Sequence, residues 1–269
     1  MDKKLGICLT GGGARGAYQA GALKALNEAN LLTKVHAYAG TSIGAANAAC
    51  LVSTTVEQLE SIWFSIPEDA LKHEKPLLSR LLEDKLKAID QGIYSLDTFS
   101  SLMMNYLNQE ELNKKRVYVT VSDGGNQAKG LFELVKSSYQ HYMRKDSKVI
   151  YLPLDELTAK ESHKAVIASC SIPVIFPAVK NQDKKYYDGG VFDNIPIKPL
   201  MAHGCDEIII IHLNRTFFFN PEDYPSVKIH EIKHQGSLGN VLDFSIAHVK
   251  KIFQWGYEDT QLFLKDYLK

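Results

Sequence analysis

Two glycine-bearing turns near the start of the chain carry residue types suited to acyl-transfer chemistry. The first is the run Gly11-Gly12-Gly13-Ala14-Arg15-Gly16, and the second is Gly40-Thr41-Ser42-Ile43-Gly44. A serine on a tight turn supplies a nucleophile, and backbone N–H groups beside it can stabilise the negative charge that develops on a substrate oxygen. Together the two turns predict a serine hydrolase.

The second turn matches the Gly-x-Ser-x-Gly pattern of a nucleophile elbow, in the setting that the pattern requires. An apolar segment at 35–39 precedes it and an alanine-rich segment at 43–52 follows it, so Ser42 is expected between a strand and a helix. Gly40 and Gly44 remove side chains that would crowd such a turn. The alternative is that Ser42 only caps the helix, a position where serine is favoured. The two flanking glycines favour the nucleophile.

The first turn also matches the Gly-x-Gly-x-x-Gly fingerprint of dinucleotide-binding sites. That fingerprint requires an acidic residue at the end of the second strand, about 20 residues further on. No Asp or Glu lies between Asn30 and Ser53, which argues against an NAD-dependent oxidoreductase. We expect instead that the backbone of Gly11–Ala14 forms an oxyanion hole. Arg15 is expected either to tie down this loop or to contact an acidic head group.

The serine needs a base within hydrogen-bond reach, and the sequence offers histidines and aspartates. Nine histidines are present, but none of the late ones lies in a glycine-bearing loop after a strand. Asp188 precedes Gly189 and Gly190, which places it on a turn open to close approach. Asp123 begins a second Asp-Gly-Gly tripeptide, which a plain surface turn also explains. The tripeptide alone does not choose between the two aspartates.

In their order and spacing, these motifs resemble those of the patatin-like phospholipases. The resemblance rests on the two glycine turns, the segment 168–177 and the tripeptide that begins at Asp188, and it spans residues 5–213. It implies a dyad of Ser42 as nucleophile and Asp188 as proton acceptor, with no catalytic histidine. It also implies a three-layer α/β/α sandwich. The implied reaction is the hydrolysis of phospholipids, lysophospholipids or related acyl esters, without a metal or other cofactor.

An aspartate base raises a question of strength, because the free side chain has a pKa of about 3.9. Burial in an apolar site would raise that pKa and make the carboxylate a better proton acceptor. Tyr186, Tyr187 and Phe192 flank Asp188 and are expected to supply such a wall. A non-catalytic lipid-binding relative is the alternative to an enzyme, and the intact pair of Ser42 and Asp188 argues against it.

Strands and helices must alternate to position these residues. We predict strands at 5–9, 35–39, 117–121 and 207–213, weaker strands at 131–135 and 149–152, a hairpin across 174–187, and helices at 17–30, 43–52 and 162–168. This order predicts a mostly parallel sheet with crossover helices. We expect one domain over 1–269, with a helical insertion at about 56–107. The C-terminal tail at 238–268 is expected to form helices at 238–253 and 261–268.

Composition narrows the class of partner. Among the 269 residues, Lys and Arg balance Asp and Glu at 31 each, which removes the simplest electrostatic argument for nucleic-acid binding. Four scattered cysteines favour reduced thiols and a cytoplasmic location. No apolar run approaches the ~20 residues that span a bilayer, so we expect any membrane contact to be peripheral. The oligomeric state is left open.

The run Phe217-Phe218-Phe219 is expected either to form a lid or membrane-contacting tip or to pack on the core.

Overall fold

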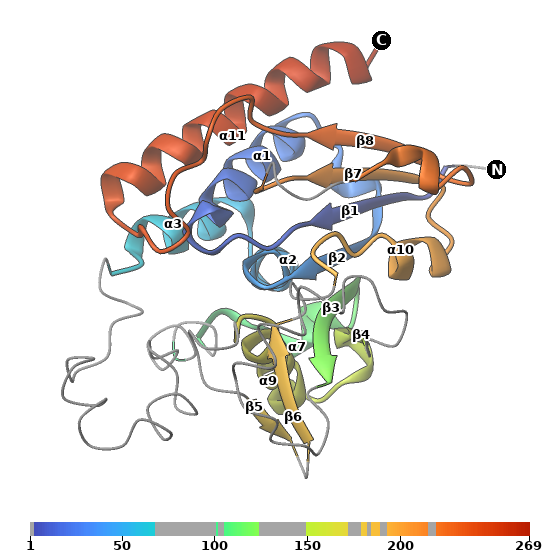
Figure 1. Ribbon diagram of the computed structural model, residues 1–269, viewed down its shortest axis with the longest axis vertical. Coiled ribbons are helices and arrows are strands. Elements are labelled where there is room, and N and C mark those ends of the chain that lie inside the picture. Colours follow the sequence, from blue (N-terminus) through green and yellow to red (C-terminus); the bar gives the residue numbers. More distant parts are fainter. Residues whose placement is uncertain are drawn as a thin grey trace.

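A mixed, mostly parallel sheet of eight strands runs through the computed structural model of the chain (Figure 1). The structure describes residues 3–67, 101, 105–123, 149–171, 179–181, 184–188, 193–214 and 219–269. The strands are β1 (Leu5–Leu9), β2 (Val35–Thr41), β3 (Arg116–Asp123), β4 (Val149–Pro153), β5 (Val179–Asn181), β6 (Lys184–Asp188), β7 (Glu207–Ile211) and β8 (Lys228–Ile232). Their order is β5-β6-β3-β2-β1-β7-β8, and β4 also pairs with β3.

The centre of the sheet is parallel, as the alternation of strands and helices predicts. The neighbours β3, β2, β1, β7 and β8 run parallel, whereas β4, β5 and β6 are antiparallel additions. Every residue of β1 and of β7 is buried. Continuous apolar runs such as these are typical of parallel strands that helices cover on both faces.

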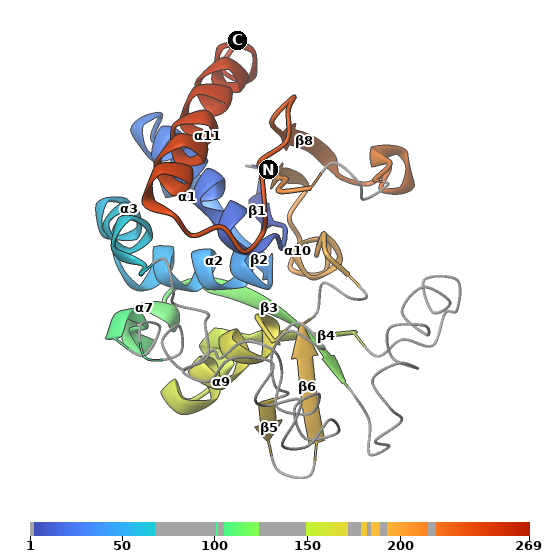
Figure 2. The same ribbon diagram turned by 60° about the vertical axis from the view of Figure 1, so that its left-hand side comes forward.

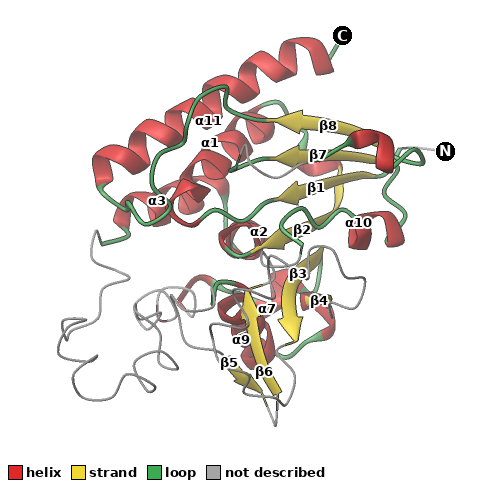
Figure 3. Cartoon of the chain, viewed as in Figure 1, coloured by secondary structure: helices red, strands yellow, loops and turns green. Residues whose placement is uncertain are grey.

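Helices form a layer on each face of the sheet, which confirms the predicted α/β sandwich (Figures 2 and 3). They are α1 (Gly16–Glu28), α2 (Ile43–Ser53), α3 (Val56–Ser65), α7 (Gln109–Leu112), α9 (Ala159–Ser169), α10 (Lys198–Ala202) and α11 (Ile246–Tyr267). Side chains of β1 alternate between two cores, because successive residues of a strand point to opposite faces. Ile7 and Leu9 pack with α1, α2, α3, α9 and α11, and Cys8 packs with α10.

Helices α1 and α11 lie side by side at unusually close range (Figures 1 and 2). A Cβ atom added to Gly21 of α1 would lie 1.9 Å from the Phe253 carbonyl oxygen. A Cβ atom on Gly256 of α11 would lie 1.9 Å from the Tyr18 carbonyl oxygen. The two glycines therefore let the backbones of these helices touch.

The C-terminal region differs from the prediction of two helices at 238–253 and 261–268. It forms the single helix α11, which begins at Ile246 and continues to Tyr267. The predicted start is wrong because Gly239 adopts φ +82°, a conformation outside the helix. The predicted interruption between 253 and 261 is wrong because α11 continues through Gly256, which packs against Tyr18 of α1. The edge strand β8 was not predicted, since its Lys-Ile-His-Glu-Ile sequence has few apolar residues.

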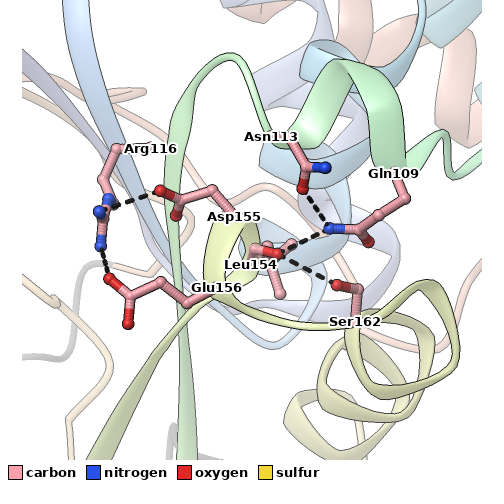
Figure 4. A network of polar contacts seen from close by, with 7 residues as sticks. All are labelled: Gln109, Asn113, Arg116, Leu154, Asp155, Glu156 and Ser162. Atoms are coloured by element: carbon pink, nitrogen blue, oxygen red, sulfur yellow. Dashed lines mark hydrogen bonds and ion pairs between the residues drawn. The ribbon is translucent and has the colours of Figure 1, made fainter.

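A polar network fastens β3 to the elements that precede α9 (Figure 4). Arg116 pairs with Asp155 at 2.9 Å and with Glu156 at 2.8 Å. The Leu154 carbonyl accepts hydrogen bonds from the Gln109 side chain at 2.9 Å and the Ser162 hydroxyl at 3.3 Å. These bonds fix the position of α9, whose last residue reaches the candidate site.

Other predictions on the chain's organisation meet the structure only in part. The hairpin is present as β5 and β6, and β4 fulfils the prediction at 149–152. Most of the predicted insertion at 56–107 and the weaker strand at 131–135 lie outside the described residues. Among the helices that the structure describes, none has both the length and the apolar composition needed to cross a bilayer.

Candidate active site

Ser42 lies at the sharp turn between β2 and α2. Its backbone has φ 56° and ψ −128°, which is rare for a residue with a side chain and typically costs about 1–3 kcal/mol. Ser42 occupies the N-cap position of α2, but its side chain makes no capping hydrogen bond. The alternative role as a capping side chain is therefore wrong, and the strained strand-to-helix turn has the elbow geometry that the Gly-x-Ser-x-Gly pattern predicts.

The two glycines of this elbow, Gly40 and Gly44, lie where any larger side chain would clash with the backbone. A Cβ atom on Gly40 would lie 2.5 Å from the Ala45 nitrogen, and one on Gly44 would lie 2.3 Å from the Leu9 carbonyl oxygen. Real Cβ atoms do not approach backbone so closely. Gly40 thus lets the turn fold back on itself, and Gly44 lets α2 rest on the end of β1.

The first glycine turn packs directly against this elbow. A Cβ atom on Gly11 would lie 3.0 Å from the Ser42 Cβ atom and 3.2 Å from the Thr41 carbonyl oxygen. Gly16 faces Ile43 in the same way, with a Cβ-to-Cγ1 distance of 2.6 Å. The structure therefore brings together the two turns that the sequence singled out.

Two of the four predicted oxyanion donors already have acceptors. The Gly11 N–H donates to Asn194 Oδ1 at 3.0 Å, and the Ala14 N–H donates to the Val241 carbonyl at 2.8 Å. The N–H groups of Gly12 and Gly13 have no acceptor within the described part of the chain. Gly13 adopts φ +58° and lies against Val241, where a side chain would not fit. The geometry therefore leaves Gly12 and Gly13 as the open donors of this turn.

Arg15 fastens the glycine turn to the C-terminal half of the chain. Its Nε and Nη2 donate to the Gly239 carbonyl at 2.8 and 2.6 Å. Its Nη1 donates to the Asn214 side chain and, at 3.5 Å, to the Leu213 carbonyl. A planar guanidinium suits this role because its donors point in fixed directions. Of the two expected roles, the hydrogen bonds correspond to tying down the loop.

Strand β3 is shared by three neighbouring strands, and this sharing determines where β6 lies. β4 pairs with residues 118–122 of β3 and so occupies one edge of it. β2 pairs with 116–120 and β6 with 121–123, and both stretches overlap that of β4. A strand has only two hydrogen-bonding edges, so β2 and β6 must lie on the same one.

The shared edge brings β2 and β6 end to end. β2 finishes at Thr41, opposite Thr120, and β6 finishes at Asp188, opposite Val121. Thr120 and Val121 are consecutive, and the residue after Thr41 is Ser42. The backbone therefore places Ser42 next to the end of the strand that carries Asp188. Gly189 and Gly190 lie outside the described residues.

The segment that follows Asp188 crosses the ends of β2 and β1. The Asp193 carbonyl accepts a hydrogen bond from the Thr41 hydroxyl at 2.9 Å. Burial raises the pKa of the Asp193 carboxyl, whereas hydrogen bonds from the Tyr151 hydroxyl and the Ile195 N–H oppose that rise. One residue later, the buried Asn194 reaches Gly11. Asp193 and Asn194 therefore contact both glycine turns.

Three of the late histidines, His212, His230 and His234, lie next to carboxylates. His212 lies 2.9 Å from Glu231, and His230 lies 2.7 Å from Glu207. His234 pairs with Asp259 at 2.8 Å. These pairs connect β7, β8 and α11.

Sequence reasoning missed the side chains that support the turns. Asn194 and Asn214 both bond to Gly11, and Ser169 bonds to the Ser42 N–H. Their only sequence signal was the position of Ser169 and Asn194 beside recognised motifs. In the phenylalanine run, Phe219 is half-buried and packs with Tyr224, whereas 217 and 218 lie outside the described residues.

Comparisons with known proteins agree with this geometry. The chain matches the family model described as "Patatin-like phospholipase" over residues 7–201, more than half of its length. It is 42% identical over 53 residues to uncharacterized NTE family proteins of Mycobacterium bovis and Mycobacterium tuberculosis. That stretch covers 20% of this chain and 9% of each relative, so the chain matches only a small part of those proteins.

Solved structures show the same fold. VipD from Legionella pneumophila superposes with a TM-score of 0.55 at 15% identity, over 99% of this chain and 67% of VipD. Human GIVD cytosolic phospholipase A2 gives a TM-score of 0.53 at 10% identity, over 98% of this chain and 62% of the human chain. At these identities the likeness concerns the fold alone. The match to the family model shows that the chain belongs to the patatin-like phospholipase family.

Proposed function

We propose that this chain is a serine acyl hydrolase that cleaves carboxylic ester bonds of phospholipids, lysophospholipids or related acyl esters. The observation that supports it most directly is the convergence at Ser42. A strained serine lies beside the end of the strand that carries Asp188 and against the turn that holds the open donors Gly12 and Gly13. Membership of a phospholipase family supports lipid esters as the substrate class.

In the proposed reaction, Ser42 Oγ attacks the acyl carbonyl carbon while its proton passes to Asp188. The carbonyl oxygen becomes negatively charged and accepts hydrogen bonds from the Gly12 and Gly13 N–H groups. Collapse of this intermediate expels the alcohol, which takes the proton from Asp188, and leaves the acyl group on Ser42. A water molecule then gives a proton to Asp188 and attacks the acyl carbonyl carbon; the bond to Ser42 Oγ breaks, Oγ takes the proton back from Asp188, and the fatty acid is released.

A lipid substrate implies contact with a membrane or micelle. We propose that this contact is peripheral and that the protein acts from the cytoplasm. The packing of Phe219 against Tyr224 supports the core-packing alternative for that ring. Replacing Phe217, Phe218 and Phe219 with serine tests whether this run forms a lid or a membrane-contacting tip. Unchanged liposome binding would rule that role out.

Covalent labelling by a fluorophosphonate tests the proposed enzyme. The wild-type protein should be labelled once, at Ser42, and Ser42→Ala should abolish labelling and lower ester turnover by ~10³-fold or more. Asp188→Asn should abolish turnover and leave the fold intact. Asp123→Asn is the matched control. Asp123 begins the same tripeptide, but it lies on β3 opposite Tyr186, two residues beyond the position opposite Asp188. A wild-type protein that binds liposomes but resists labelling would favour a non-catalytic lipid-binding relative.

A further inference from the structure

The Ser169 hydroxyl occupies a special position between two backbone groups. Its Oγ accepts a hydrogen bond from the Ser42 N–H at 2.8 Å. The same hydroxyl donates to the Thr120 carbonyl at 2.7 Å. Ser169 is fully buried and is the last residue of α9. One side chain thus joins the elbow, β3 and α9.

The Ser169 hydroxyl lies where the hydrogen-bonded pairing of β2 and β3 ends. The two strands pair up to Thr41 and Thr120, and Ser42 then leaves the ladder to enter its strained turn. The Ser42 N–H and the Thr120 carbonyl both belong to buried residues at this point. A buried backbone group that lacks a hydrogen-bond partner destabilises the folded protein. A hydroxyl accepts and donates at once, so Ser169 satisfies both groups.

We infer that Ser169 is a positioning residue that holds Ser42 in its reactive conformation; the inference rests on the proposed function. The bond to the Ser42 N–H fixes the backbone of the very residue whose Oγ must attack. A displacement of about 1 Å at a reacting atom can lower a rate by about 10²-fold. Ser169 is itself held firmly, because α9 begins with a capping box between Thr158 and Glu161.

Ser171 offers a matched control two residues further along. It is also a fully buried serine, and its hydroxyl donates at 2.8 Å to the Ile167 carbonyl of the preceding helix α9. Among the described residues, no bond joins it to the elbow. Removing either hydroxyl takes away the same atom from the same region of the chain. Only Ser169→Ala removes a bond to Ser42.

The test compares Ser169→Ala and Ser171→Ala in the full chain with a chromogenic ester. We expect Ser169→Ala to lower kcat by about 10- to 100-fold with KM changed by less than about threefold, because the nucleophile and not the substrate site is disturbed. Ser171→Ala should retain kcat within about threefold. Hydrogen exchange at the Ser42 amide should accelerate in Ser169→Ala alone. Equal kcat values in the two variants would overturn the inference.

Two further measurements keep the outcomes distinct. If Ser169→Ala does not fold, Ser169→Cys takes its place, and its kcat should fall because a thiol is a weak hydrogen-bonding group; an unchanged kcat would count against the inference. If the wild-type protein shows neither esterase activity nor fluorophosphonate labelling, the proposed function fails. In that case the Ser42 amide exchange still reports whether Ser169 holds the elbow.

Discussion

Asn194 and Gly11 are joined by a reciprocal pair of hydrogen bonds across 183 residues of sequence. Asn194 Oδ1 accepts from the Gly11 N–H at 3.0 Å, and its Nδ2 donates to the Gly11 carbonyl at 3.4 Å. The amide side chain thus pairs with the first glycine turn as a neighbouring strand would. It connects the segment after Asp188 with the proposed oxyanion hole.

We expect Asn194→Ala to lower both stability and activity. The Gly11 N–H would remain buried without an acceptor, at a cost of about 1–3 kcal/mol in the free energy of unfolding. Esterase turnover should fall as well, because the donors at Gly12 and Gly13 follow directly. Urea unfolding and ester hydrolysis measure the two effects. Asn113→Ala removes only an exposed hydrogen bond from the Gln109 side chain and should lower stability by less than Asn194→Ala does. Equal effects of the two substitutions would count against a special role for Asn194.

Arg15→Lys should lower kcat for every ester by a similar factor. Lysine keeps the charge but loses the fixed fork of donors that joins Gly239, Leu213 and Asn214. Arg15 also lines a cavity of about 470 Å³ with Lys233 and His234, so the head-group alternative deserves a direct comparison. The measurement pairs a neutral chromogenic ester with an anionic phospholipid. A loss confined to the anionic lipid would show that Arg15 binds head groups and would contradict the positioning role.

Gly256→Ala should destabilise the protein although alanine favours helices. The new methyl group would meet the Tyr18 carbonyl oxygen at 1.9 Å and force α11 away from α1. Overpacking of this kind costs about 1–3 kcal/mol, which exceeds the gain of about 1 kcal/mol from helix propensity. Thermal or urea unfolding measures the net change. Gln261→Ala, on the exposed face of the same helix, should be nearly neutral. A stabilised Gly256→Ala variant would disprove the close contact.

Glu231→Gln should remove part of the acid dependence of stability. The His212 ring, 2.9 Å away, and next Lys233 lower the pKa of Glu231 to about 2, against the opposing effect of burial. A carboxylate whose pKa is lowered on folding stabilises the protein above its unfolded pKa and loses that contribution as the pH falls toward its folded pKa. The difference in the free energy of unfolding between wild type and variant should therefore be largest at pH 7 and decrease between about pH 4.5 and pH 2.

Urea unfolding at pH 7 and pH 3.5 gives this difference directly. Glu222→Gln is a suitable control, because Glu222 is exposed, and it should change stability by less than about 0.5 kcal/mol at either pH. A difference for Glu231→Gln that stays constant with pH would show that the ion pair with His212 contributes nothing to folding.

The sequence was most informative where a signal is local. Apolar runs predicted β1 and β7, and glycine spacing predicted both turns, because each depends on neighbouring residues. The edge strand β8 gave no such signal, since an exposed strand needs few apolar residues. A glycine alone does not show whether a helix ends. Gly239 lies outside α11, whereas Gly256 lies within it and packs against α1.

The supporting shell of the site could not be predicted in the same way. Ser169 and Asn194 act through partners 127 and 183 residues away, and no local pattern encodes such pairs. Which peptide N–H groups stay open also depends on distant acceptors. The sequence therefore predicted where donors gather but not that Gly11 and Ala14 are already engaged.

The bonds of Arg15 to Gly239 span 224 residues, and this separation sets the order of events during synthesis. Residues near the start leave the ribosome first, at about 5–20 residues per second, long before their partners. The first glycine turn can form its hydrogen bonds to Asn194, Gly239 and Val241 only after these residues have been synthesised. A nascent chain can complete its first strands and helices early, yet it carries no finished donor turn until its C-terminal region has emerged.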